Sequence, residues 1–128
     1  MSRKIKILVV EDESWEVRYL QIILRGLGYE FCAPAARGRD AIRQAEIEKP
    51  DLILMDIRLA GVMDGIEAAR EILARQQVPI VFVTGYALKE IRERAEALNP
   101  IAFLEKPVSR EDIKAIVDAL FYSKGGLA

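Results

Sequence analysis

The chain has 128 residues, of which 52% are apolar and 30% are charged. This length suits one compact domain, because domains cluster at about 100–150 residues. Basic and acidic residues nearly balance at 19 and 20, so we expect no overall field that recruits nucleic acid or an anionic membrane surface. The sequence contains no histidine, which excludes Ser-His-Asp catalysis, imidazole metal ligands and a phosphohistidine within this chain.

The cysteine content and the apolar runs favour a cytoplasmic location. Cys32 is the single cysteine, so neither an internal disulfide nor a Cys-x-x-Cys zinc site can form. Apolar runs such as Ile7–Val10 and Pro79–Val83 are far shorter than the roughly 20 residues of a membrane helix. Met1–Lys4 leads directly into a strand-like segment and leaves no room for a signal peptide.

Five short apolar segments, several of them rich in β-branched residues, have the length of strands. They are Ile5–Val10, Tyr29–Ala33, Leu52–Met55, Ile80–Val83 and Ile101–Leu104. The strongest of them are continuous apolar runs rather than alternating ones. Such runs are typical of a parallel sheet that is covered on both faces.

A helical pattern follows each of these segments. The apolar positions are Val17, Leu20, Leu24 and Leu27; Ala41, Ile42 and Ala45; Ile66, Ala69 and Leu73; Leu88, Ile91, Ala95 and Leu98; and Ile113, Ile116, Val117 and Leu120. Five strand–helix units predict an α/β fold: a doubly wound, five-stranded parallel sheet with helices on both faces. We expect one domain over residues 1–128, with a core of 5–122, a short tail at 124–128 and no output domain.

Polar residues follow four of the predicted strands where each strand ends. They are Glu11, Asp12 and Glu13; Asp56; Thr84 and Gly85; and Glu105, Lys106 and Pro107. In a parallel sheet these ends meet at one edge, so the side chains are expected to converge. Crowded carboxylates repel one another, and Mg²⁺ with oxygen ligands relieves that repulsion. Mg²⁺ and a lysine also favour phosphoryl transfer, for which a carboxylate can be the nucleophile.

Each feature alone has a purely structural explanation. Acidic residues at 11–13 could open a helix, and Asp56 could be a turn residue after a buried strand. Thr84 and Gly85 are ordinary in a loop, and Pro107 could simply stop a strand. Their occurrence at the ends of four different strands in one series favours a shared site.

With these motifs, the sequence resembles the receiver domains of bacterial two-component response regulators, from Ile5 to about Tyr122. The motifs are Ile-Leu-Val-Val-Glu-Asp-Glu at 7–13, Leu-Ile-Leu-Met-Asp-Ile-Arg-Leu at 52–59, Asp-Gly at 64–65, Val-Thr-Gly at 83–85 and Leu-Glu-Lys-Pro at 104–107. The resemblance implies the flavodoxin-like strand order 2-1-3-4-5. The loop after Asp56 looks one residue longer than is common in the family and lacks a frequent proline.

The resemblance implies a chemical role for four of these residues. Asp56 corresponds to the phosphoacceptor. Glu11 and Asp12 correspond to the acidic pair that binds Mg²⁺, together with Asp56 and the backbone carbonyl of Arg58. Mg²⁺ is thus the expected cofactor.

The resemblance also implies the parts of a switch. Thr84 corresponds to the switch hydroxyl, and Lys106 to the lysine that contacts the phosphoryl group. Phe103 takes the place of the switch aromatic; its purely structural explanation is a core phenylalanine in the last strand. Gly85 stands where alanine or serine is frequent, and Pro107 is expected to follow a cis peptide bond.

The implied function is that of a phosphorylation switch rather than an enzyme, apart from self-catalysed phosphotransfer and autodephosphorylation. The donor would be a phosphohistidine of a histidine kinase or a histidine phosphotransfer protein. The signal would pass to an unknown downstream protein through the face formed by residues 87–123. We expect no nucleic-acid or membrane partner, and a monomer or a weak, phosphorylation-dependent homodimer.

Three alternatives differ in their chemistry. A phosphate-independent docking or dimerisation module would not need the complete set of site residues. A Mg²⁺-dependent aspartyl phosphatase of the haloacid dehalogenase type needs a second aspartate two residues after Asp56, where this chain has Arg58. A flavodoxin-like cofactor binder needs a phosphate loop after the first strand, where this chain has three acids.

Overall fold

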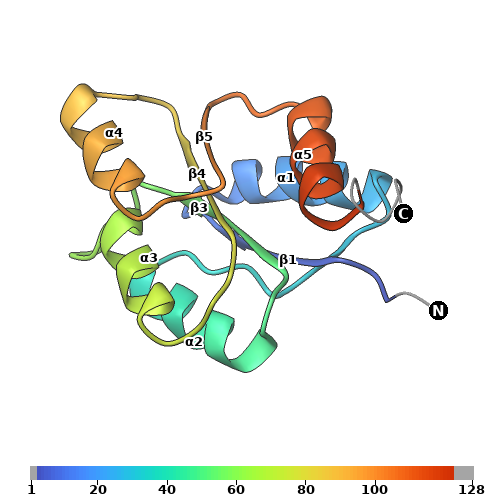
Figure 1. Ribbon diagram of the computed structural model, residues 1–128, viewed down its shortest axis with the longest axis horizontal. Helices are drawn as coiled ribbons and strands as arrows, with labels where there is room; N and C mark the ends of the chain where they lie inside the picture. The colour runs from blue at the N-terminus through green and yellow to red at the C-terminus, as the bar shows by residue number, and fades with distance from the viewer. Residues whose placement is uncertain (1–2, 123–128) are drawn as a thin grey trace.

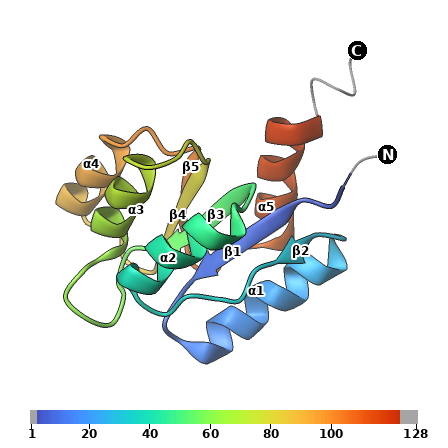
Figure 2. The same ribbon diagram turned by 90° about the horizontal axis from the view of Figure 1, so that it is seen from below.

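The computed structural model describes residues 3–122 and shows a five-stranded parallel sheet with helices on both sides (Figure 1 and Figure 2). The strands are β1 (Lys6–Val10), β2 (Glu30–Phe31), β3 (Leu52–Asp56), β4 (Ile80–Thr84) and β5 (Ala102–Glu105). The helices are α1 (Ser14–Gly26), α2 (Gly38–Glu48), α3 (Gly65–Leu73), α4 (Lys89–Glu96) and α5 (Arg110–Val117), with a π-helical turn over Asp118–Tyr122. The strand order β2-β1-β3-β4-β5 confirms the predicted fold. The predicted tail at 124–128 lies outside the described residues.

Alternation along the central strands divides the core between the two faces of the sheet. In β3, Ile53 and Met55 pack with buried residues of α2, α3 and α4, whereas Leu52 and Leu54 pack with α1 and α5. Figure 1 shows the same division, with α1 and α5 on one side and the other three helices on the opposite side. Because both faces are covered, the central strands β1, β3 and β4 are apolar at nearly every position.

The same alternation sorts the polar residues at the strand ends. Asp56 is in step with Leu52 and Leu54, on the face that α1 and α5 cover. Thr84 is in step with Phe82 on the opposite face, where Phe103 also packs. Asp56, the nucleophile candidate, therefore lies on one face of the sheet, and the switch candidates Thr84 and Phe103 lie on the other.

Apart from single-residue shifts at strand ends, two predictions differ from the structure. The strand predicted over Tyr29–Ala33 is only Glu30–Phe31, because Pro34 has no N–H to continue the ladder with β1; pairing resumes at an isolated bridge between Val10 and Ala35. Leu88, predicted on a core-facing stripe, is 48% exposed. It precedes the first residue of α4, so helical spacing does not apply to it.

No helix within residues 3–122 combines the length and the apolar character that a membrane crossing requires.

Asp51 ties the segment before β1 to the start of β3, and its removal is expected to destabilise the fold. Its carboxylate accepts hydrogen bonds from the Arg3 guanidinium and from the Lys6 N–H, the latter at 2.8 Å. The bonds from Arg3 hold the pKa of Asp51 below its ordinary value, against the opposing effect of burial. We expect Asp51→Asn to lower the free energy of unfolding by about 1 kcal/mol at pH 7, measured by urea denaturation.

The sign of the pKa shift predicts how this loss depends on pH. Because the pKa of Asp51 is lower in the folded state, the carboxylate stabilises the fold above its ordinary pKa of 3.8, and that stabilisation is lost as the pH falls through the folded pKa. The difference between Asp51→Asn and wild type should therefore shrink in strong acid. A difference that stays constant with pH would contradict this assignment.

Candidate functional site

The carboxyl ends of β1, β3, β4 and β5 surround a single open cleft. Its lining consists of Glu11, Asp12, Glu13, Glu16, Asp56, Arg58, Gly85, Tyr86 and Lys106. These residues come from four chain segments that the parallel sheet brings to one edge. Five of the nine carry a carboxylate and two carry a positive charge, so the cleft is acidic and favours cations.

Glu11, Asp12 and Asp56 each offer one carboxylate oxygen, and these oxygens all lie within 4.8 Å of one another. Glu11 and Asp56 are 3% and 5% exposed, whereas Asp12 is exposed. Burial, followed by the neighbouring Asp56, raises the pKa of Glu11 to about 8, against the opposing hydrogen bonds from the Glu13 N–H and Lys106. Three hard oxygen donors that crowd together fit a divalent cation such as Mg²⁺.

Backbone N–H groups hold the two buried carboxylates in place. The N–H of Glu13 donates to Glu11 Oε2 at 3.0 Å, and the N–H of Arg58 donates to Asp56 Oδ1 at 3.2 Å. Each bond spans two residues and forms where the chain turns after a strand. The same local geometry therefore orients both carboxylates toward the cleft.

Lys106 is the cation that the structure places against these carboxylates. Its Nζ donates to Glu11 Oε1 at 2.9 Å and to Asp56 Oδ2 at 3.1 Å, and it also forms an ion pair with Glu16. Burial lowers the pKa of Lys106, but the hydrogen bonds to Glu16, Glu11 and Asp56 outweigh that effect and leave the pKa above its ordinary value. The ammonium therefore stays charged. The peptide bond between Lys106 and Pro107 is cis.

Thr84 is fully buried, and its hydroxyl is engaged by the following loop. Thr84 Oγ1 accepts from the Tyr86 N–H and donates to the Tyr86 carbonyl, both at 3.3 Å. The residue between them, Gly85, leaves open space: a Cβ there would lie 3.9 Å from Lys106 Cδ. The threonine thus points to the β4–α4 loop and does not line the cleft.

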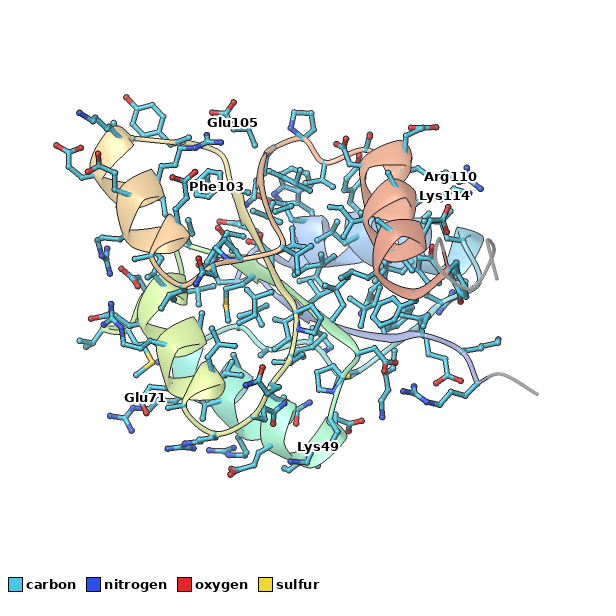
Figure 3. The ribbon with its side chains drawn as sticks, viewed as in Figure 1. Lys49, Glu71, Phe103, Glu105, Arg110 and Lys114 are labelled. Carbon is cyan, nitrogen blue, oxygen red and sulfur yellow. The ribbon has the colours of Figure 1, made fainter. Side chains whose placement is uncertain are left out.

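Phe103 also lies outside the cleft, between β5 and α4 (Figure 3). The Arg92 guanidinium of α4 stacks 4.6 Å from the centre of its ring. A second arginine of α4, Arg94, pairs with Asp64 at 3.1 Å. Within α4, Ala95 is buried and Ile91 packs against the core, so these two contacts add to a small apolar contact.

The structure thus brings six of the predicted site residues into one cleft and leaves three outside its lining. Those inside are Glu11, Asp12, Asp56, Arg58, Gly85 and Lys106; those outside are Thr84, Phe103 and Pro107. Two further residues with contacts at or near the site, Glu16 and Arg92, were not predicted from the sequence. Both occupy polar positions on helices, where a charged residue is ordinarily solvated, so their residue types gave no signal.

Replacing Asp56 with asparagine is expected to stabilise the protein in a metal-free solution. The substitution removes one of two buried carboxylates that repel each other, while Lys106 retains Glu11 and Glu16 as partners. Above about pH 8, where Glu11 is ionised, we expect a gain of about 1 kcal/mol, or about 4 °C in melting temperature for a domain of this size, followed by circular dichroism with a chelator. A melting temperature below that of wild type would contradict the predicted repulsion.

Comparison with known proteins places the chain among signalling domains. A family model described as the response regulator receiver domain matches residues 7–118. The transcriptional regulatory protein PdtaR of Mycobacterium tuberculosis is 38% identical over 108 residues, which cover 84% of this chain and 52% of that protein. The phyllosphere-induced regulator PhyR of Methylorubrum extorquens is 32% identical over 121 residues, or 93% of this chain and 45% of that protein. The chain spans about half the length of these two relatives.

Solved structures agree in fold and include one with a metal. The receiver domain of a modulated diguanylate cyclase from Desulfovibrio desulfuricans G20 superposes with a TM-score of 0.88 at 32% identity, covering 98% of this chain and 100% of that chain. The receiver domain of the sensor histidine kinase PA1611 from Pseudomonas aeruginosa PAO1, with magnesium coordinated in its active site cleft, has a TM-score of 0.82 at 37% identity, covering 91% and 97%. Because the family model matches residues 7–118, which is most of the chain, and PdtaR is 38% identical over 84% of it, the chain belongs to the response regulator receiver domain family.

Proposed function

We propose that this receiver domain accepts a phosphoryl group from a phosphohistidine onto Asp56, with Mg²⁺ as cofactor. The observation that carries the proposal is the convergence of the Glu11, Asp12 and Asp56 carboxylates in one open cleft, where Glu11 and Asp56 also pair with Lys106. Asp56 is the last residue of the central strand β3. Its carboxylate is buried, and its Oδ2 accepts a hydrogen bond from Lys106.

In the proposed reaction, a carboxylate oxygen of Asp56 attacks the donor's phosphorus. The P–N bond breaks, and the imidazole leaves with the bonding electron pair. Mg²⁺, when held by Glu11, Asp12, Asp56 and the backbone carbonyl of Arg58, would neutralise negative charge on the phosphoryl oxygens. Lys106 would move from Asp56 Oδ2 to a phosphoryl oxygen, since its hydrogen bonds already place it beside the nucleophile.

The proposed output begins at Thr84. A phosphoryl group adds about −1.5 to −2 charges to the cleft, by analogy with phosphoserine. A hydrogen bond to that group would draw the Thr84 hydroxyl away from the Tyr86 backbone and alter the loop that leads into α4. Phe103, beneath Arg92 of α4, connects this movement to the face formed by α4, β5 and α5.

Several parts of the proposal concern the protein's surroundings. The donor would be a histidine kinase or a histidine phosphotransfer protein, and the receiving partner another protein. The chain would act as a monomer or a weak phosphorylation-dependent homodimer, without further catalytic activity. A single domain over 1–128 and a cytoplasmic location stay predictions, the latter supported by the free, buried Cys32.

Intact mass spectrometry after incubation with Mg²⁺ and acetyl phosphate tests the proposal. We expect one phosphoryl adduct on wild type, none on Asp56→Asn and none after chelation. Asp40→Asn, at a half-exposed position of α2 outside the cleft, is the matched control and should be modified like wild type. An adduct that persists in Asp56→Asn would overturn the assignment of the acceptor.

A phosphate-independent docking module is the second candidate. If wild type takes no adduct and Mg²⁺ does not quench the fluorescence of Trp15, which lies next to Glu16 and is 66% exposed, this candidate is favoured. Quenching without an adduct, by contrast, would indicate a metal-binding cleft with a short-lived phosphate. Beryllofluoride would then replace the phosphoryl group in the same experiment.

A further inference from the structure

Glu16 contacts the reactive part of the cleft without belonging to the carboxylate group that fits a metal. It stands in the first turn of α1, and its side chain is 17% exposed. Its carboxylate pairs with the Nζ of Lys106, whereas the three oxygens that lie close enough to share a cation come from Glu11, Asp12 and Asp56.

Lys106 and a divalent cation would compete for the same oxygen ligands. Within the part of the chain that the structure describes, the ammonium has three carboxylate partners, Glu11, Glu16 and Asp56, which match its three N–H donors. Two of these partners are also in the metal-fitting group. A cation that takes Glu11 and Asp56 therefore leaves Glu16 as the partner that remains for the lysine.

We propose that Glu16 is a positioning residue for Lys106. When Mg²⁺ occupies Glu11 and Asp56, Glu16 retains the ammonium at the α1 side of the cleft. This pairing both reduces the repulsion between the lysine and the metal and keeps the lysine beside the phosphoryl acceptor. The second effect rests on the proposed function, whereas the first concerns metal affinity alone.

Mg²⁺ affinity, measured by calorimetry, tests the proposal independently of phosphorylation. We expect Glu16→Gln to weaken Mg²⁺ binding about fivefold, because the lysine then competes harder for Glu11 and Asp56. Glu13→Gln is the matched control, since Glu13 also lines the cleft but makes no ion pair with Lys106 within residues 3–122. It removes the same charge and should have a clearly smaller effect.

Two further variants test whether Mg²⁺ affinity depends on the position of the Glu16 carboxylate beside Lys106 or only on its charge. Glu16→Asp keeps the charge on a side chain one methylene shorter, so it should weaken Mg²⁺ binding as Glu16→Gln does. In a Lys106→Met background, adding Glu16→Gln should change Mg²⁺ affinity no more than Glu13→Gln does. Circular dichroism confirms folding; should Lys106→Met fail to fold, the Glu16→Asp comparison decides the question.

The possible outcomes separate this inference from the proposed function. Equal effects of Glu16→Gln and Glu13→Gln, or wild-type affinity in Glu16→Asp, would overturn the role of Glu16 while the phosphorylation of Asp56 still stood. A Glu16-dependent Mg²⁺ affinity in a protein that takes no phosphoryl group would support the role of Glu16 and count against the proposed function. Failure of wild type to bind Mg²⁺ would overturn both.

Discussion

Gly65→Ala is expected to cost about 3 kcal/mol of the free energy of unfolding, the upper end for overpacking a core. A Cβ at this position would lie 2.0 Å from the carbonyl oxygen of Asp56, 2.9 Å from the Asp56 carbonyl carbon and 2.9 Å from the Cα of Ile57. All three atoms belong to the backbone, so no side-chain rotamer can relieve the clash. The Gly65 N–H also donates a hydrogen bond to the Ile57 carbonyl at 2.7 Å, which holds the start of α3 against the end of β3.

Urea denaturation measures this loss, and Gly26→Ala provides a matched control. Gly26 ends α1, and a Cβ at that position would meet nothing within 4 Å, so alanine there should stabilise the helix by about 0.5–1 kcal/mol. The backbone that must move in Gly65→Ala is that of Asp56, the nucleophile candidate, and Ile57. The variant should therefore also take up less phosphoryl group on Asp56 than Gly26→Ala does. Wild-type stability of Gly65→Ala would contradict the close approach.

Gly65 illustrates what a motif conveys and what it leaves out. The pair Asp64 and Gly65 contributed to the family resemblance, but their physical roles depend on geometry that spacing does not encode. Asp64 caps α3, accepting from the Glu67 N–H while the Glu67 carboxylate accepts from the Asp64 N–H. Gly65 is required because α3 starts directly against the end of β3.

Most of the fold could be predicted because the same pattern, an apolar strand followed by an amphipathic helix, is repeated along the chain. β1, β3 and β4 are buried on both faces, so each strand is apolar at nearly every position and stands out against the amphipathic helices. The edge strand β2 and the largely exposed α4 have few buried residues, and there the predicted bounds fail. Local sequence therefore specifies elements best where burial is greatest.

The candidate site was predictable only as far as the sheet determines it. Strand ends bring Glu11, Asp56 and Lys106 together in any parallel sheet with this strand order. Glu16 and Arg92 lie on helices and contact residues that are distant in the sequence, Lys106 and Phe103. The Thr84 hydroxyl is oriented by its hydrogen bond with Tyr86, two residues later. Such contacts depend on tertiary placement and on single rotamers, which residue spacing does not fix.

The affinity for Mg²⁺ is expected to rise steeply with pH because Glu11 must ionise to serve as a ligand. Burial, followed by the neighbouring Asp56, raises the pKa of Glu11 to about 8. Below that pH, binding of the metal must displace a proton, so the affinity should fall by up to about tenfold for each pH unit. Calorimetry in buffers of different ionisation enthalpy measures both the affinity and the proton released.

The stability of the metal-free protein should change in the opposite direction. Since the folded pKa of Glu11 lies above its ordinary value of 4.5, the folded state binds the extra proton between these two values. Its stabilising contribution is complete below about pH 4.5 and is lost as the pH rises toward 8. Glu11→Gln should remove both trends, and a pH-independent Mg²⁺ affinity in wild type would contradict them. Protons and Mg²⁺ thus compete for one buried carboxylate, so a single residue would link the metal loading of the cleft to the solution pH.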